Sequence, residues 1–185
     1  MLSGSERQYL LRVARCAIEA AVLNKPMAAV SIDSPALKKP SGAFVTLHEA
    51  QELRGCIGYV DPRKPLLATV QDAAVKAAME DPRFPPVGID ELEEIEIEIS
   101  VLSPLQGIRS PGEIEVGRHG LVVEFGSHRG LLLPQVAAEY GWDAETFLQQ
   151  TVRKAGLAAH VVDEQDLKVF VFTAEIFNEH EATAV

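Results

Sequence analysis

The amino-acid sequence predicts an α+β fold built on an antiparallel or mixed sheet. Segments with helical and with strand-like periodicity are interspersed along the chain, several strands are joined by short turns, and no strand–helix–strand rhythm repeats. The chain has 185 residues, of which 47% are hydrophobic and 24% are charged. This size and composition are typical of a globular domain that buries a core without disulfides or a metal. We therefore expect one domain over residues 1–185, alone or with a smaller lobe.

The first 80 residues predict two helices and a hairpin. Ser3 and Glu6 fit a capping box, and apolar residues at helical spacing predict a helix from about residue 5 to 23, with Cys16 as a small buried residue beside its apolar face. The stretch "SIDSPALKKPSG" reads as a loop before a strand. The segments "AFVTLHE" and "RGCIGYV" then predict a β-hairpin, and Pro65 opens a helix through "PLLATVQDAAVKAAMED".

The next clear strand is "EEIEIEISVLSP", in which every second residue is apolar. We expect Ile95, Ile97, Ile99 and Val101 to face the core, and Glu94, Glu96, Glu98 and Ser100 to form a solvated acidic face. The stretch "EIEVGRHGLVVEFGSHRGLLLP" reads as a run of short strands with glycine-rich turns.

The last third of the chain predicts two helices and a final strand. One helix opens at Pro134 and ends near Gly141, and the next is capped by Asp143 and ends at Gly156. The segment "LKVFVFTAEIF" alternates as a single last strand. The polar residues 178–185 are expected to form a frayed tail.

The charge balance limits the partners that we expect. Lys and Arg number 17 and Asp and Glu number 27, which gives a net charge of −10. Such a chain repels phosphates at long range, so we expect no nucleic acid and no membrane surface as a partner. The amphipathic N-terminus lacks the apolar block of a signal peptide, and no run approaches the ~18 apolar residues of a spanning helix. Cytoplasm is the expected location.

The sequence gives no reason to expect a cofactor or a metal. It contains no phosphate-binding glycine loop in a strand-to-helix context and no serine in a Gly-x-Ser-x-Gly elbow. The two cysteines, Cys16 and Cys56, have neither metal-type spacing nor a disulfide framework. The histidines also lack metal-ligand spacing; they are His48, His119, His128, His160 and His180.

The main candidate for chemistry is the hexapeptide "LRGCIG", residues 53–58. Gly55 and Gly58 inside a strand indicate a bulge or the close approach of a ligand, and Cys56 between them could present its sulfur into a cleft. The alternative is that the glycines form a bulge and Cys56 is an unreactive packing residue. From these residues alone the alternative is favoured, because buried unreactive cysteines are commoner than catalytic ones.

Three further residues could serve a site at Cys56. Arg54 lies close enough to lower the pKa of the thiol if the backbone bends, and His48 on the preceding strand is the nearest base. The stretch "DPRFPPVG" forms a rigid loop that could hold Arg83 and Phe84 toward a ligand, or could be only a stiff connector.

Taken together, these stretches resemble the AMME-syndrome candidate protein family, whose bacterial members are called AmmeMemoRadiSam system protein A. The resemblance runs from about Ala43 to Phe177 through "GAFVTLHEAQELRGCIGYVDPRKPL", "DPRFPPV", "LEEIEIEISVLSP", "VGRHGLVVEFGSHRGLLLPQVAAEYGWDAETFLQQTVRKAGL" and "VFVFTAEIF". The hexapeptide "LRGCIG" is the signature of that family. The resemblance implies an α+β fold in two unequal lobes, with the hexapeptide near the cleft between them.

The same resemblance implies an association with Memo-like and radical-SAM proteins, but it supplies no reaction. Family members often carry a cysteine just before "RKAGL", where this chain has Val152. This departure argues against a mechanism that needs a second thiol there.

Three functions therefore remain open. In the first, Cys56 is a nucleophile or covalent attachment point, Arg54 or Arg83 binds an anionic group, and the thiol has a depressed pKa with a base nearby. In the second, the protein is an adaptor that docks a small ligand or a Memo-like or radical-SAM partner, and Cys56 is unreactive. In the third, the hexapeptide is purely architectural. We place a ligand-binding or catalytic role ahead of the adaptor and leave open whether the protein is an enzyme.

Overall fold

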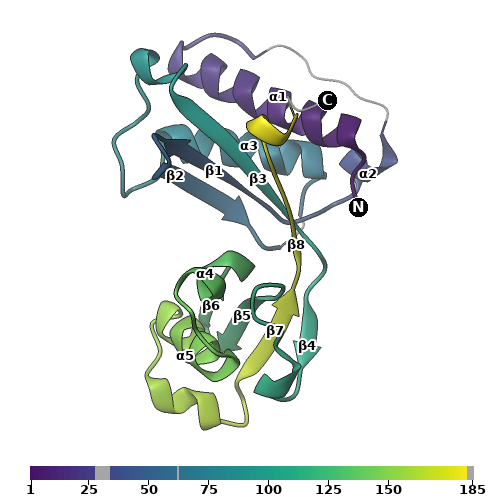
Figure 1. Ribbon diagram of the computed structural model, residues 1–185, viewed down its shortest axis with the longest axis vertical. Helices are drawn as coiled ribbons and strands as arrows, with labels where there is room; N and C mark the ends of the chain where they lie inside the picture. The colour runs from purple at the N-terminus through teal and green to yellow at the C-terminus, as the bar shows by residue number, and fades with distance from the viewer. Residues whose placement is uncertain (28–33, 62, 183–185) are drawn as a thin grey trace. The chain divides into compact units, whose positions relative to one another are not determined.

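The protein is described here from a computed structural model that covers residues 1–27, 34–61 and 63–182. The chain divides into two compact units, Met1–Leu102 with Glu175–Val185 and Ser103–Ala174 (Figure 1). Each unit combines helices with a sheet that contains antiparallel strand pairs. The α+β class predicted from the sequence is confirmed.

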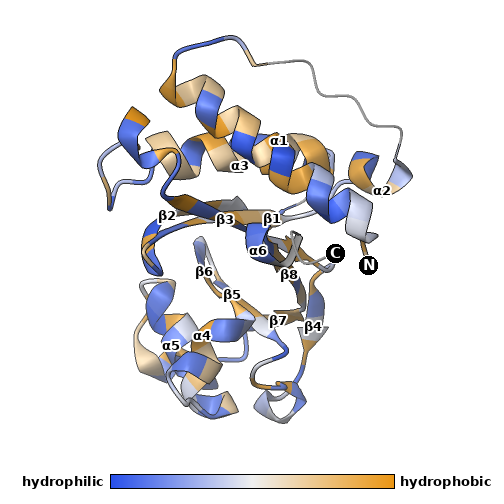
Figure 2. Cartoon of the chain, turned by 45° about the horizontal axis from the view of Figure 1, so that its top comes forward, coloured by the Kyte–Doolittle hydropathy of each residue, from blue (hydrophilic) through white to orange (hydrophobic). Residues whose placement is uncertain are grey.

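The first unit is a sheet with helices packed on one of its faces. The strand order is β2 (Glu52–Tyr59), β1 (Ala43–Glu49), β3 (Ile95–Leu102) and β8 (Ala174–Asn178). Helices α1 (Gly4–Val22) and α3 (Leu66–Met79) lie side by side over this sheet (Figures 1 and 2). The shorter elements are the helices α2 (Pro35–Lys38) and α6 (Glu179–Ala182) and the 3-10 turn η1 (Ile89–Glu91).

The core of the first unit follows the predicted periodicities. Val45, Leu47, Ile97 and Ile99 point from β1 and β3 toward the helices and are fully buried. Four buried alanines give α3 a smooth inner face that can approach the sheet closely; they are Ala73, Ala74, Ala77 and Ala78.

The second unit has its own sheet and its own core. The strand order is β4 (Gln106–Ile108), β7 (Lys168–Phe172), β5 (Gly120–Phe125) and β6 (His128–Leu132). Buried side chains from β5, β7 and α5 make the core around Phe147, Leu121 and Val171. The helical elements are α4 (Pro134–Glu139), α5 (Ala144–Lys154) and the 3-10 turns η2 (Pro111–Glu113) and η3 (Ala159–Asp163).

The predicted helix ends in the second unit are confirmed. The Asp143 carboxylate accepts a hydrogen bond of 2.8 Å from the Thr146 amide and so caps α5. Gly141 and Gly156 follow α4 and α5 with φ values of 64° and 76°, which L-residues adopt only at a cost in strain.

The last strand was predicted as one element, and that prediction is wrong. The chain leaves the sheet of the second unit after β7 and enters the sheet of the first unit as β8, with Thr173 between them. Apolar and polar residues alternate through Thr173. An alternating sequence indicates which face of a strand is buried, but it does not indicate which strand lies beside it, so the change of sheet could not be seen.

The prediction of a frayed tail is also wrong for residues 178–182. Asn178 belongs to β8, and α6 follows it directly. The Glu179 carboxylate forms an ion pair with Arg15 of α1 and accepts a hydrogen bond of 3.0 Å from the Ile97 amide. These contacts join residues that are far apart in the sequence, so local composition could not reveal them. Residues 183–185 lie outside the described residues.

Four smaller expectations also change. Cys16 is exposed, because it lies about 200° around the helix from the buried residues Ala14 and Ile18. Ser100 is buried rather than solvated. The stretch "EIEV" contributes to η2 and a turn instead of a strand. Within the predicted loop at residues 31–42, Pro35–Lys38 form the helical turn α2, capped by Ser34, while residues 31–33 lie outside the described residues.

Among the described residues, no helix is both long enough and apolar enough to cross a membrane.

Candidate functional site around Cys56

The hexapeptide forms most of β2, and its backbone contains a β-bulge. In the register with β1, Leu47 lies opposite Gly55 and His48 lies opposite Leu53, so Arg54 is the extra residue. A bulge bends the strand and redirects the side chain of the extra residue. Arg54 and Cys56 therefore do not share an environment as they would in a regular strand.

The two glycines are required by packing on either side of Cys56. A Cβ atom on Gly55 would lie 2.3 Å from the backbone oxygen of Ala77, so the glycine lets α3 approach β2. A Cβ atom on Gly58 would lie 2.3 Å from Cγ of Phe44. Both glycines thus have an architectural role that is independent of any ligand.

Cys56 lies opposite Thr46 on β1 and is held through its thiol and its amide. The Thr46 hydroxyl donates a hydrogen bond of 3.3 Å to Sγ, and the Cys56 amide donates one of 2.9 Å to Oδ2 of Asp81. Thr46 and Asp81 are both buried, whereas Cys56 is half-buried. The thiol therefore has a fixed position next to the surface.

Asp81 also fixes Arg83, which follows it in the loop after α3. Nε of Arg83 donates to Oδ1 of Asp81 at 2.9 Å, and Nη2 donates to Oδ2 at 2.6 Å. The same Nη2 donates to the backbone oxygen of Cys56 at 3.2 Å. The Asp81 side chain is 2% exposed and that of Arg83 is 53% exposed. A buried carboxylate thus holds a surface guanidinium against the backbone of Cys56.

The surroundings of the thiol raise its pKa on balance. Burial raises the pKa of Cys56, while the hydrogen bond from Thr46 and the charge of Arg83 act in the opposite direction and the carboxylates of Asp81 and Glu98 add to the rise. Hydrogen bonds from Arg83, together with the one from the Cys56 amide, lower the pKa of Asp81. The depressed thiol pKa expected of a resting nucleophile is therefore not met.

Arg54, which the sequence suggested as the activator of the thiol, is engaged elsewhere. Its Nε and Nη2 donate to the Glu91 carboxylate at 2.6 Å and 3.0 Å, and its Nη1 donates to the backbone oxygen of Pro85 at 3.0 Å. The side chain is buried. This ion pair raises the pKa of Arg54 and lowers that of Glu91. Arg54 thus fastens the loop after α3 to β2, and the expectation that it acts on Cys56 is wrong.

Within the described residues, no hydrogen bond joins His48 to the Cys56 thiol. The register places Thr46, not His48, opposite Cys56. In the part of the chain that the structure describes, the Cys56 thiol accepts a hydrogen bond from Thr46, its amide donates one to Asp81, and its carbonyl accepts one from Arg83.

Sequence reasoning singled out Cys56 and Arg83, which the structure brings together, but it missed Asp81 and Thr46. The sequence did contain a signal for Asp81. An Asp before Pro82 favours a turn, and this Asp stands two residues before Arg83, with which it could pair. Thr46 carried none, since its role depends on the pairing register. In the described ranges, no group of three or more His, Cys, Asp or Glu side chains is arranged to hold a metal ion.

The fold and the site define a class: a two-unit α+β protein with a half-buried cysteine held beside a fixed surface arginine. The chain belongs to the AMMECR1 family, whose sequence model matches residues 11–177. That match includes residues of both units.

Several similar proteins come from archaea. The crystal structure of the uncharacterized protein PH0010 from Pyrococcus horikoshii superimposes with a TM-score of 0.86 at 43% identity, and the match covers 92% of this chain and 90% of that one. A protein from Methanothermobacter thermautotrophicus is 45% identical over 185 residues, 96% of each chain. Protein MJ0810 from Methanocaldococcus jannaschii is 41% identical over 189 residues, 98% of this chain and 94% of its own.

Proposed function

We propose that the Cys56 centre binds a small molecule with an anionic group, which Arg83 holds beside the thiol. The observation that carries this proposal is the fixed orientation of a half-exposed guanidinium next to Cys56. Nη1 of Arg83 has no hydrogen-bond partner in the described part of the chain. A preorganised donor of this kind suits carboxylate, phosphate or sulfate oxygens.

The charge of Arg83 is already balanced by Asp81. Recognition would therefore depend on short hydrogen bonds to the ligand more than on long-range attraction, which agrees with the acidic net charge of the chain. We therefore expect an anionic ligand to bind through direct contact with the guanidinium and not to be drawn to it from a distance.

The enzymatic form of the proposal makes Cys56 the nucleophile or the point of covalent attachment. This form requires loss of the thiol proton, which burial opposes and Arg83 favours. The family resemblance further supports an association with Memo-like and radical-SAM proteins, and the composition supports a cytoplasmic location without nucleic-acid or membrane partners.

One observation favours the adaptor as a second candidate. Tyr140 and Trp142 stack with ring centroids 4.9 Å apart, and Tyr140 is 69% exposed. Exposed aromatic side chains of this kind are enriched at protein interfaces. In this alternative the hexapeptide acts only through the close packing at Gly55 and Gly58.

The test is the pH dependence of Cys56 alkylation by iodoacetamide, in a Cys16→Ser background because Cys16 is exposed. We expect native-state labelling with an apparent pKa above the ordinary value of about 8.5. Arg83→Gln should raise this pKa further, whereas Arg118→Gln, which removes an exposed ion pair with Glu115, should leave it unchanged.

Anion binding is read from the same reaction. At matched ionic strength, sulfate should protect Cys56 more than chloride does, and Arg83→Gln should abolish the difference. If Cys56 reacts only when the protein unfolds, or if sulfate gives no protection, the centre is not a ligand site and the adaptor is favoured.

A further inference from the structure

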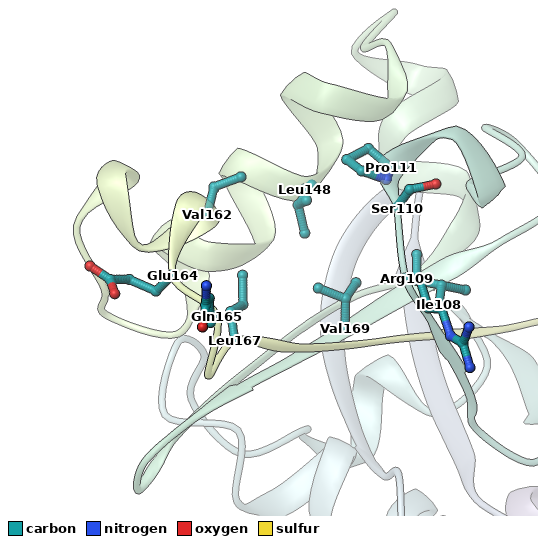
Figure 3. A pocket seen from close by; sticks show the side chains of 10 residues that line it. All are labelled: Ile108, Arg109, Ser110, Pro111, Leu148, Val162, Glu164, Gln165, Leu167 and Val169. Carbon is teal, nitrogen blue, oxygen red and sulfur yellow. The ribbon is translucent and has the colours of Figure 1, made fainter.

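A second hollow lies in the unit Ser103–Ala174 and is independent of the Cys56 centre. It is a pocket of about 230 Å³ over one end of the sheet (Figure 3). Its floor is Ile108 of β4 and Val169 of β7, which are paired across the two strands. Leu148 of α5 forms one wall, and Val162 and Leu167 on either side of the η3 end form another.

The walls of this pocket are held in place by hydrogen bonds within the loops that form them. Oε1 of Glu113 accepts from the amides of Arg109 at 2.8 Å and Ser110 at 3.1 Å, which fixes the loop after β4. On the other side, the Glu164 amide donates to Val161 and the Leu167 amide donates to Glu164, both at 3.1 Å. The pocket is thus formed before any ligand arrives, as is usual for small-molecule sites.

The lining of the hollow is mixed: six of its ten residues are apolar, and the other four are Arg109, Ser110, Glu164 and Gln165. Figure 3 shows Leu148, Val162 and Val169 around the open space, with Glu164 and Arg109 extending outward at opposite ends. Two opposite charges outside the hollow favour neither a cation nor an anion within it. An ion placed on the apolar floor of Ile108 and Val169 would lose hydration there, which is unfavourable.

The size of the pocket limits the ligand further. An apolar cavity of about 150 Å³ in a protein core can hold benzene. The present volume, about 230 Å³, has room for a ring with a few additional atoms. Among the described residues, the large exposed apolar side chains lie elsewhere in the chain, so the pocket is not part of a broad apolar surface for protein docking; they are Met1, Leu53, Ile89, Val116, Tyr140 and Ile176.

We propose that this pocket is a binding site for a small uncharged molecule, either a single aromatic ring or a branched aliphatic group. The ligand lies on Ile108 and Val169 and is enclosed by Leu148, Val162 and Leu167. This second site does not depend on the function proposed for Cys56.

The test is a titration of the full chain with p-cresol, followed through the methyl signals of its Ile, Leu and Val residues by NMR. We expect saturable shifts at Ile108, Leu148, Val162, Leu167 and Val169, with a Kd of about 1 mM because the ligand has few atoms. Benzylamine and phenylacetate, which place a charge on the same ring, should bind at least about tenfold more weakly.

Two variants separate binding in the pocket from binding elsewhere. Val162→Trp should fill the hollow and abolish the shifts, whereas Val116→Trp, at an exposed position outside it, should preserve them. If Val162→Trp does not fold, Leu167→Phe provides a smaller filling with the same expected loss. Absence of saturation, equal affinity for either ion, or unchanged binding in a folded filled variant would overturn the proposal.

Discussion

Asp81 connects the parts of the Cys56 centre at the scale of single residues. Its carboxylate accepts the amide of Cys56 and both Nε and Nη2 of Arg83 while its own side chain is almost fully buried. A buried carboxylate is tolerated when its oxygens are hydrogen-bonded and its charge is paired. We therefore expect Asp81 to set the position of the arginine and, through it, the reactivity of the thiol.

Replacing Asp81 by Asn should destabilise the protein and change its response to acid. At pH 7 we expect a loss of about 2 kcal/mol, because two charge-assisted hydrogen bonds are weakened. The pKa of Asp81 is lowered in the folded state, so its carboxylate contributes stability that is fully present above its unfolded value of about 3.9 and is lost as the pH falls through the folded value. The difference between the two proteins should therefore shrink below about pH 4.

Urea unfolding of both proteins at several pH values measures this difference. Asp166→Asn, at an exposed carboxylate, is the control and should have little effect at any pH. A difference that stays constant down to the lowest pH would show that Asp81 acts by shape and not by charge.

Gly55 gives a prediction about packing. Gly55→Ala should destabilise the protein by about 1–3 kcal/mol, because the new methyl group would meet the Ala77 carbonyl at 2.3 Å and α3 would have to move. Gly4→Ala is the matched control, since nothing lies within 4 Å of a Cβ atom at Gly4. Thermal unfolding of the two variants compares them; equal midpoints would mean that the contact between α3 and β2 is loose.

The residues of the site were only partly predictable, for a physical reason. A cysteine between two glycines and an arginine in a proline-rich loop are visible in the sequence, and the structure does bring Cys56 and Arg83 together. Proximity along the strand was misleading for Arg54, because the bulge turns it toward Glu91. The pKa of the thiol depends on burial by distant segments, which no local pattern reports.

At the scale of elements, the chain ends contribute to the first unit through specific contacts. Arg15 of α1 donates to the backbone oxygens of Leu92 and Ile95, each at 2.8 Å, and forms an ion pair with Glu179 at the start of α6. Periodicity predicted α1, α3, α5 and the hairpin β1–β2 because each buries one regular face. It could not predict the docking of α6, which depends on polar contacts between distant residues.

Removal of the Glu179 side chain tests this docking. Glu179→Ala should lower stability by about 1–2 kcal/mol, because Arg15 loses its ion pair and the Ile97 amide loses its acceptor. Hydrogen exchange of that amide should quicken at the same time. Glu93→Ala, at an exposed carboxylate, is the control. An unchanged exchange rate at Ile97 would contradict the contact.

At the scale of the whole molecule, the two units have separate cores. One core is centred on the sheet β2–β1–β3–β8, and the other is built around Phe147 of α5. Segments with separate cores often unfold as separate cooperative units. The sequence analysis expected two lobes but not the place where they divide, because the chain leaves the first unit at Leu102 and returns to it only at Glu175.

Core truncations should therefore act locally. Phe147→Ala should cost about 3–5 kcal/mol and should reduce the hydrogen-exchange protection of β5 and β7, while β1 and β3 keep theirs. Ile97→Ala, in the other core, should give the reverse pattern. Loss of protection throughout the chain in either variant would mean that the two units unfold as one.

Ser103 and Thr173 lie side by side where the chain enters and leaves the second unit. The Ser103 amide donates to the Thr173 carbonyl at 2.9 Å, and the Thr173 amide donates back to the Ser103 hydroxyl at 3.0 Å. The segment between these residues therefore begins and ends at the same place. A short turn in its place would still join β3 to the neighbouring strand β8. The pairing of β3 with β8, and with it the sheet that carries Cys56, therefore does not require the second unit as a connection.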